Sequence, residues 1–440
     1  MVTLNDSGLP PAPISATYSI VISNPPPPVV NAAPLPGAAV NQPFSFTFTA
    51  TAGLPPYQNW KETGTLPAGI APLTTDGVLS GTPTTTGAFP ISITVEDSLA
   101  QVSAAQGFNL QVYQHGFKAT GAMGTARTSH TATLFPDGTV LIAGGVSVPS
   151  AEKYDPSTGK FTPTAGSVTR YSHTATLLAD GKVLITGGGG LNGDAVLATA
   201  ELFDPSTGMF TLTAGSMSVA RTGHKATLSD GKVLITGGGS TTADLFDPST
   251  GKFTPTTGKL VTARVNDTAT LLANGKVLIT GGFNTVGLAT AELYDPATES
   301  FSATGSMGTA RVAHTATLLN TGANTGKVLV AGGSGLSSAE IYDPSTGVFS
   351  ATGALAVGRS QHTATLLNDG TVLVVGGSDA SSNTLATSEL FNATSGTFAG
   401  TGGLQTPREG HTATLLKDGT VLATGGVNIG GILASAEVYQ

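Results

Sequence analysis

The chain has 440 residues, only 10% of them charged, and carries a formal net charge of −8 at pH 7. This acidic balance argues against nucleic acid or an anionic membrane as a partner, because both attract basic proteins. The 59 glycines indicate many tight turns. The lack of cysteine is typical of a bacterial secreted or surface β-protein that does without disulfides. We expect no nucleic-acid partner and no membrane insertion.

Residues 1–24 look like a fragment of a β-domain. Residues 2–7 and 16–22 parallel residues 93–98 and 106–112, so they resemble the last two strands of an upstream copy of the domain that follows. Either the chain is a piece of a longer protein, or residues 2–22 form a hairpin that is exchanged with another copy of the chain. An isolated hairpin is marginal in water, which favours a partner. Four consecutive prolines then predict a stiff linker.

Residues 25–114 predict a β-sandwich, because polar and apolar residues alternate over 44–48, 89–95 and 108–112. Segments 66–70, 77–83 and 95–98 resemble the putative-Ig (cadherin-like) domains of bacterial surface proteins. Trp60 is the only tryptophan and is expected to fill the core, with stacking on sugars as the alternative. Cadherin relatives bind calcium with acids at such junctions, so the resemblance implies Glu96 and Asp97 as calcium candidates; a solvated turn is the alternative.

Residues 115–440 contain one block of sequence seven times. The first copy runs from Arg127 and His130 through a Gly144-Gly145 pair to Glu152 and Phe161, and the block restarts every 43 to 51 residues. Such a period predicts a repeat architecture, because one unit cannot bury its own apolar face. Each copy has four β-prone runs separated by Asp-Gly, Gly-Gly and Asp-Pro-Ser-Thr-Gly turns, without a helical apolar period.

Four strands per unit, repeated radially, make a β-propeller. We therefore expect an all-β chain: a seven-bladed β-propeller with an N-terminal Ig-like β-sandwich. The paired glycines after the second run and the Tyr/Phe-Asp-Pro of the third resemble the kelch repeat. The seventh copy stops before its Gly-x-Phe run, and residues 116–120 supply a matching strand ahead of the first copy. We expect this strand to close the ring and so remove two free sheet edges.

All seven arginines of the chain are repeat residues, and each copy also has one acid at an equivalent position. We expect seven structural ion pairs, one per blade, because the guanidinium fork suits buried carboxylates. The alternative is an arginine-lined ligand channel. The predicted pairs, in chain order, are Arg127 with Glu152, Arg170 with Glu201, Arg221 with Asp244, Arg264 with Glu292, Arg311 with Glu340, Arg359 with Glu389 and Arg408 with Glu437.

Six of the seven histidines are also repeat residues, and the fourth copy has Asp267 in their place. A ring of histidines at a channel can bind a metal or titrate near neutral pH. The simpler interpretation is that each imidazole hydrogen-bonds to backbone within its own blade. The repeat histidines are His130, His173, His224, His314, His362 and His411.

The sequence favours no catalytic site. Propellers of this type include relatives of galactose oxidase, whose copper site uses a tyrosine cross-linked to cysteine, and this chain has no cysteine. Most acids occupy repeat positions, and no spacing singles out the pair of carboxylates that a glycosidase needs. The glycine runs lack the Lys-Ser/Thr of a phosphate loop, and there is no zinc pattern. We therefore expect no enzyme activity, no cofactor and no metal.

The loops after the Gly-Gly pairs vary most in length, and per-repeat variation marks the binding face of repeat proteins. Unselected drift in loop length is the alternative. The candidate binding residues on these loops are Asn192, Asp194, Phe283, Asn284, Asp379, Asn383, Asn428 and Ile429.

The sequence thus predicts a non-enzymatic binding or adhesion protein, secreted or at the cell surface, that presents a propeller face on an Ig-like stalk to a glycan or surface protein. Two alternatives stay open: a structural subunit of an extracellular polymer or filament, assembled by strand or hairpin exchange through residues 2–22, and a cryptic glycan-active hydrolase.

Overall fold

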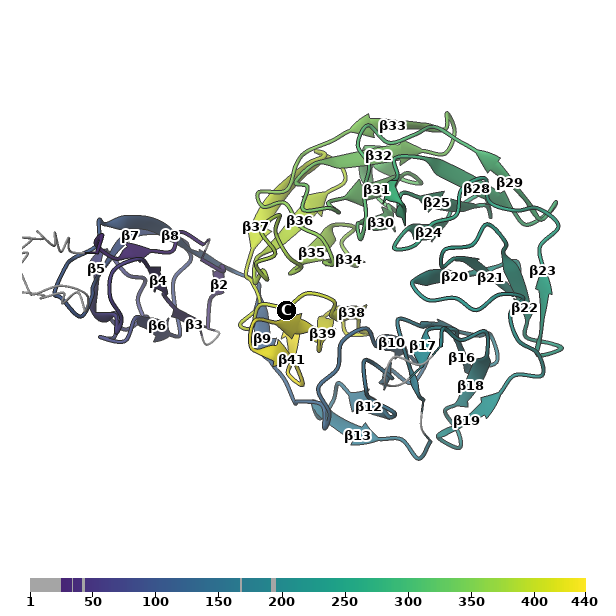
Figure 1. Ribbon diagram of the computed structural model, residues 1–440, viewed down its shortest axis with the longest axis horizontal. Helices are drawn as coiled ribbons and strands as arrows, with labels where there is room; N and C mark the ends of the chain where they lie inside the picture. Colours follow the sequence, from purple (N-terminus) through teal and green to yellow (C-terminus); the bar gives the residue numbers. More distant parts are fainter. Residues whose placement is uncertain (1–24, 34, 42–43, 167, 191–194) are drawn as a thin grey trace, which may run out of the picture.

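The computed structural model describes residues 25–440 except residues 34, 42–43, 167 and 191–194. The described part consists of β-strands and one short 3-10 helix, Gly322–Asn324. It forms a small sandwich beside a ring of seven four-stranded sheets (Figure 1). This arrangement confirms the all-β fold class. The predicted hairpin at residues 2–22 lies outside the described residues.

The sandwich contains one four-stranded sheet and two short strand pairs. The sheet has the order β2 (Ala38–Ala39), β8 (Gln106–Tyr113), β7 (Gly87–Glu96) and β5 (Gln58–Gly64), and β2 runs parallel to β8. The pairs are β3 (Phe44–Thr47) with β6 (Val78–Gly81), and β1 (Val29–Val30) with β4 (Ala50–Thr51).

Trp60 lies in the core of the sandwich, 5% exposed, with its ring stacked on Phe48 at a centroid distance of 6.4 Å. The indole ring is therefore out of reach of a sugar. Asp97 is also buried, so the predicted solvated turn is wrong for this residue. Its carboxylate accepts hydrogen bonds from the backbone N–H groups of Leu54, Leu99 and Gln101. Burial raises the pKa of Asp97, but these donors outweigh it and the pKa is lowered.

The ring has seven blades, numbered here in chain order and given from the inner to the outer strand. Blade one is β10 (Thr131–Leu134), β11 (Val140–Ala143), β12 (Ala151–Asp155) and β13 (Lys160–Pro163); blade two is β15 (Thr174–Leu177), β16 (Val183–Thr186), β18 (Ala200–Asp204) and β19 (Met209–Leu212); blade three is β20 (His224–Ser229), β21 (Lys232–Gly237), β22 (Asp244–Asp247) and β23 (Lys252–Pro255). Blade four is β24 (Thr268–Leu271), β25 (Val277–Thr280), β28 (Ala291–Asp295) and β29 (Ser300–Ala303); blade five is β30 (Thr315–Leu318), β31 (Val328–Ala331), β32 (Ala339–Asp343) and β33 (Val348–Ala351). Blade six is β34 (Thr363–Leu366), β35 (Val372–Val375), β36 (Ser388–Asn392) and β37 (Thr397–Thr401); blade seven is β38 (Thr412–Leu415), β39 (Val421–Thr424), β42 (Ala436–Tyr439) and β9 (Phe117–Ala119).

The second strand of every blade contains three or four consecutive apolar residues because it is covered on both faces. In β25, all four residues are buried, and the core between blades three and four combines Val277 and Ile279 with Leu234 of blade three. The cores thus lie between blades, as expected for repeats that cannot bury their apolar faces alone. Across strands three and four, an aromatic pair such as Tyr154 and Phe161, with centroids 4.8 Å apart, covers the outer side.

The glycine pair after the second strand is required by the approach of the next blade. Gly281 has φ +59°, and a Cβ placed there would lie 2.7 Å from both the carbonyl oxygen of Arg311 and Cε1 of His314. A left-handed backbone and a side-chain clash both exclude other residues at this position.

Blade seven is completed by the strand that precedes the first repeat. Strand β9 pairs antiparallel with β42, with Phe117 opposite Tyr439 and Ala119 opposite Glu437. Just before β9, Nδ1 of His115 lies 3.1 Å from the carbonyl oxygen of Gln440. The ring is therefore closed by strands from opposite ends of the repeat array.

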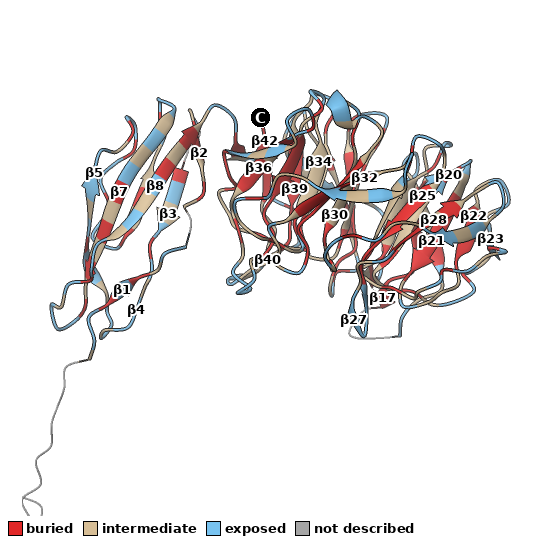
Figure 2. Ribbon diagram, turned by 90° about the horizontal axis from the view of Figure 1, so that it is seen from above, coloured by how far each residue is buried: buried red, intermediate tan, exposed pale blue. Residues whose placement is uncertain are grey.

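The sandwich sits against the edge of blades six and seven (Figures 1 and 2). The N–H of Gly403 donates to the carbonyl oxygen of Gly37 at 2.8 Å, and the N–H of Gly402 donates to that of His115 at 3.0 Å. Glycines at this joint allow the two backbones to approach closely.

Strands alternate in direction within a blade, so the propeller has two distinct faces. We call "connection face" the one that carries the loops after each second strand and the links between blades. Two hairpins, β26 (Phe283–Asn284) with β27 (Val286–Gly287) and β40 (Val427–Asn428) with β41 (Gly431–Ile432), protrude from it (Figure 2). A third short pair, β14 (Arg170–Tyr171) with β17 (Gly189–Gly190), lies on the same face. The "turn face" carries the Asp-Gly and Asp-Pro-Ser-Thr-Gly turns.

Candidate functional site

The structure places each repeat arginine against the acid of its own repeat. The N–O distances run from 2.5 Å for Arg170 with Glu201 to 3.0 Å for Arg221 with Asp244, and every arginine is at most 2% exposed. The other five pairs are Arg127–Glu152, Arg264–Glu292, Arg311–Glu340, Arg359–Glu389 and Arg408–Glu437.

These guanidinium groups tie together the loops of one blade. Arg311 donates from Nη1 to the carbonyl oxygens of Gly332 and Ser338, at 2.8 and 2.7 Å. The second carboxylate oxygen of Glu340 accepts the backbone N–H of Gly308 in the link from the previous blade. Because every arginine is at most 2% exposed and its Nη groups donate within its own blade, the arginines do not line a ligand channel.

The repeat histidines connect neighbouring blades. Each Nε2 lies 3.0 to 3.2 Å from the hydroxyl of a threonine on the inner strand of the preceding blade, as for His314 with Thr268. These hydrogen bonds run between blades, whereas the sequence predicted bonds within each blade. Burial, followed by the charge of the nearby arginine, lowers the pKa of His314 to about 3. The imidazoles are therefore neutral at pH 7.

A series of backbone hydrogen bonds, called the collar below, links the blades to one another on the connection face. It consists of the residue before each of the six repeat histidines and, in blade four, of Asn266 before Asp267. The N–H of each member donates to the carbonyl oxygen of the previous one at 2.9 to 3.3 Å, over six successive links. All members have φ between +50° and +60°. The collar residues are Ser129, Ser172, Gly223, Asn266, Ala313, Gln361 and Gly410.

A hollow of about 360 Å³ opens at the collar over blades four to six. Its lining has amide, hydroxyl and small apolar groups and no charged side chain. The hairpin β26–β27 forms a wall beside it, since Phe283 pairs with Val265 and a Cβ placed at Gly287 would lie 3.6 Å from Cγ2 of Val312. The lining residues are Asn266, Val312, Ala313, Ser334, Ser360 and Gln361.

The hollow is the candidate site. None of the described loop residues predicted from the sequence lines it, although the blade-four hairpin that carries Phe283 and Asn284 lies beside it. Phe283 is 44% exposed on the hairpin wall, followed by the exposed Asn284. Asp379 and Asn383 instead bind each other within a tight turn, where the Asp379 carboxylate accepts the Asn383 N–H and amide at 2.9 and 3.0 Å.

The remaining predicted residues are elsewhere. The side chain of Asn428 is used within its own structure, because its amide donates to the carbonyl oxygen of Pro407 and its oxygen accepts the N–H of Gly430. Ile429 is fully exposed at the tip of that hairpin. Asn192 and Asp194 lie outside the described residues.

Four polar residues of the hollow were missed: Asn266, Ser334, Ser360 and Gln361. The signal that could have identified three of them is the dipeptide between the repeat arginine and histidine. Its flanks are constant, but the dipeptide itself reads Val265-Asn266 in blade four and Ser360-Gln361 in blade six. This variable dipeptide supplies the collar residue and three of the four polar residues of the hollow, whereas Ser334 comes from the loop after Gly332-Gly333.

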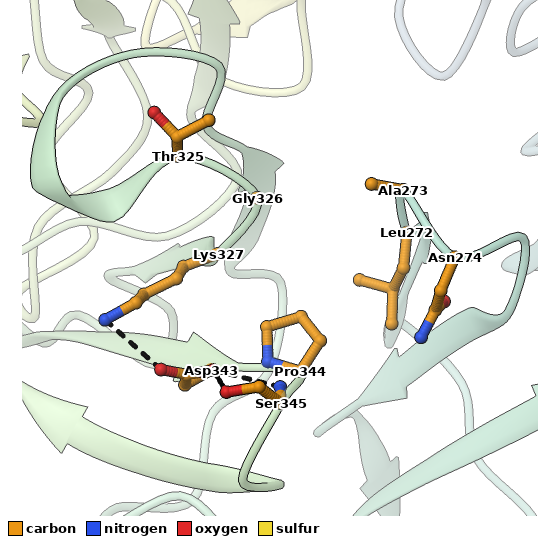
Figure 3. Close-up of a pocket in the computed structure, with 9 residues that line it drawn as sticks. All are labelled: Leu272, Ala273, Asn274, Thr325, Gly326, Lys327, Asp343, Pro344 and Ser345. Carbon is orange, nitrogen blue, oxygen red and sulfur yellow. Dashed lines mark hydrogen bonds and ion pairs between the residues drawn. The ribbon is translucent and has the colours of Figure 1, made fainter.

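A second hollow, of about 390 Å³, lies on the turn face between blades four and five (Figure 3). It includes Leu272 and Asn274 of one turn and the ion pair of Lys327 with Asp343, whose N–O distance is 3.2 Å. Both partners are about 30% exposed, and the same Lys–Asp pair recurs as Lys182–Asp204 and Lys276–Asp295. This hollow therefore consists of ordinary repeat turns.

Within the described ranges, no three His, Asp or Glu side chains are grouped so that they could share a metal ion. No described helix is long and apolar enough to span a membrane.

Comparisons with known proteins agree with this architecture. Residues 26–113 match the family model described as a putative Ig domain. A fungal alcohol oxidase of the AA5 family, solved in complex with copper, has a TM-score of 0.61 and 20% identity, over 74% of this chain and 76% of its own. The structure of YjhT has a TM-score of 0.50 and 16% identity, over 63% of this chain and 98% of its own. At these identities the likeness shows the propeller fold alone. No curated protein matches the chain.

Proposed function

We propose that this protein is a non-enzymatic binding protein, which holds a glycan in the hollow on the connection face of its propeller. The observation that carries the proposal is the lining itself: uncharged amide and hydroxyl groups, three of them on the dipeptide that varies from blade to blade. Loops on a rigid scaffold commonly carry binding residues, and the collar supplies such a scaffold.

The chemistry of the lining fits a neutral sugar. The amides of Asn266 and Gln361 can both donate and accept hydrogen bonds, and the hydroxyls of Ser334 and Ser360 add two more groups of the same kind. The ring of Phe283 and the side chain of Val286, which is 63% exposed, offer an apolar wall for the C–H face of a sugar ring. A charged ligand would find no counter-charge in the lining.

The residues that line the hollow also support binding rather than hydrolysis. Glycoside hydrolysis in most families needs two carboxyl groups on either side of the scissile bond, and the lining contains none. We also propose that the protein is secreted or at the cell surface. There the Ig-like domain would act as a stalk, and a protein displaying such a glycan would be a partner.

Glycan binding can be tested with variants that remove side chains without disturbing the collar. Asn266→Gly and Gln361→Gly keep the left-handed backbone, since blades three and seven already have glycine at this position. The probes are immobilised neutral hexasaccharides of glucose, xylose, mannose and N-acetylglucosamine. We expect the parent to bind at least one of them, and the double variant to bind on the order of 100-fold more weakly, as follows from losing two hydrogen-bonding groups.

The matched control is Asn274→Ala with Thr325→Ala, which alters the hollow on the turn face and should leave binding unchanged. Equal binding by the Asn266/Gln361 variant and the parent would contradict the site. Failure of the parent to bind any of the four sugars would contradict the ligand class.

A further inference from the structure

One of the seven blade junctions departs from the rule that the others follow. At six junctions, a neutral histidine bonds to a threonine hydroxyl on the inner strand of the preceding blade. At the junction between blades three and four, both partners differ: Lys225 stands at the threonine position and Asp267 at the histidine position. Two exchanges at two facing positions of the same junction indicate that they depend on each other.

Asp267 occupies the place of the missing imidazole. A Cβ built at Gly237 would lie 2.9 Å from Oδ1 of Asp267, just as one built at Gly281 would lie 2.7 Å from Cε1 of His314. Asp267 is 1% exposed, and neither carboxylate oxygen accepts a hydrogen bond from another described residue. The shorter side chain also leaves the hydroxyl of Thr236 without a partner, although the equivalent Thr280 binds His314.

A buried carboxylate without a partner is costly, so its position calls for a cation or a hydrogen-bond donor. Lys225 lies on β20 opposite Thr236, and its side chain is half-buried. It has no ion pair within 4.0 Å among the described residues. Strand β20 packs beside β24, so Lys225 and Asp267 stand at the same junction.

We propose that Lys225 and Asp267 form an ion pair across the junction between blades three and four, in place of the threonine–histidine bond of the other junctions. The pair requires the flexible lysine stem to rotate so that its ammonium group reaches the carboxylate. Lysine is suited to this, because it is a compact charge with three rotatable donors.

The pair also positions the candidate site. Asp267 directly follows the collar residue Asn266, and its Cβ would lie 2.9 Å from a Cβ on Gly282, the neighbour of Phe283. Asn266, which lines the hollow, and the start of the hairpin beside it are thus direct neighbours of Asp267. This consequence rests on the proposed function, whereas the ion pair itself does not.

The test is a cycle of four proteins: the parent, Lys225→Thr, Asp267→His, and the double variant, which restores the repeat pattern. The lysine variant leaves the carboxylate without a cation, and the aspartate variant places an imidazole beside an ammonium group. We expect each single variant to lower the melting temperature by about 3 °C or more, and the double variant to recover at least the parental value. Additive effects of the two changes would contradict the pair.

A second cycle keeps the proposal testable if a histidine at position 267 does not fit. It uses Lys225→Met and Asp267→Asn, which remove one charge each with little change in shape. The pair predicts that the neutral double variant melts above the Lys225→Met protein. A double variant that melts at or below the single one would contradict the pair.

The pH dependence of stability gives an independent readout. The charged groups that act on Asp267 are Lys225 of blade three and Arg264 and Glu292 of its own blade; burial is the largest influence and raises its pKa to about 7. An acid whose pKa is raised by folding loses stability as pH rises from its unfolded value of about 4 through the folded value. Without Lys225 this loss must grow. We therefore expect the change in melting temperature from pH 5 to pH 8 to be more negative for Lys225→Met than for the parent, and Asp267→Asn to reduce this difference. Identical profiles for the parent and Lys225→Met would refute the pair.

Discussion

Replacing Arg311 with alanine tests how much the buried ion pairs contribute to the propeller. The guanidinium group is completely buried, lies 2.9 Å from the carboxylate of Glu340, and donates to two loop carbonyl groups and the hydroxyl of Ser338. The variant leaves Glu340, itself 6% exposed, with the backbone N–H of Gly308 but no cation.

The expected loss follows from these contacts. Removing one partner of a buried ion pair costs about 3–5 kcal/mol, because the other charge stays buried. Each carbonyl group left unpaired would add about 1–3 kcal/mol, but water entering the vacated space satisfies part of this demand. We therefore expect a loss of roughly 5 kcal/mol, which for a chain of this size lowers the melting temperature by about 10 °C.

Thermal unfolding followed by circular dichroism measures the change. The matched control is Lys276→Ala, which removes an ion pair of similar length, 3.0 Å to Asp295, but with the lysine 40% exposed. Exposed pairs contribute about 0–1 kcal/mol, so the control should melt within about 2 °C of the parent. Equal melting temperatures for Arg311→Ala and Lys276→Ala would refute the assignment of the arginines to the stability of the blades.

Two further predictions concern acid and the joint between domains. Five repeat histidines have pKa values of about 3 in the fold, led by burial, against about 6.5 when unfolded. The unfolded chain binds more protons between these values, so melting temperatures should fall as pH drops from 6.5 towards 3, and a flat profile over pH 4–6 would contradict this. Gly402→Ala places a Cβ 2.4 Å from the carbonyl oxygen of His115. It should widen the spread of domain orientations in small-angle X-ray scattering, whereas a scattering curve like that of the parent would show that the joint tolerates the methyl group.

The repeat pattern was sufficient to predict the fold, because the residues that define it act within one unit or at a fixed step to the next. Asp-Gly turns, buried second strands such as β25 and the glycine pair at Gly281 all follow from local requirements. The acid at Glu340 could be matched with Arg311 because both recur at constant spacing. The N-terminal β-sandwich was predicted from the alternation of polar and apolar residues together with its resemblance to putative-Ig domains.

The candidate site was harder to predict because it depends on contacts between blades. Asn266 and Gln361 lie nearly a hundred residues apart in the sequence and are brought together only by the collar. The collar positions have a left-handed backbone, but they are occupied by Ser, Gly, Asn, Ala and Gln, so residue type does not predict this conformation. Variation in loop length predicted Asp379 and Asn428 as binding residues, but both side chains form hydrogen bonds with nearby backbone groups instead. The hydrogen-bond partners of the histidines also lie in the preceding blade, so they cannot be predicted from the sequence of one repeat alone.

The way in which the ring closes has a mechanical consequence. A pull on the Ig-like domain is transmitted along β8 through only three residues, 114–116, into β9, the outermost strand of blade seven. Force applied along the chain shears β9 against β42, where three residue pairs and the contact of His115 with Gln440 resist it. Strands loaded in shear must break their hydrogen bonds together rather than one at a time. A pull on the Ig-like domain therefore loads the closure of the ring directly, together with the hydrogen bond between Gly37 and Gly403.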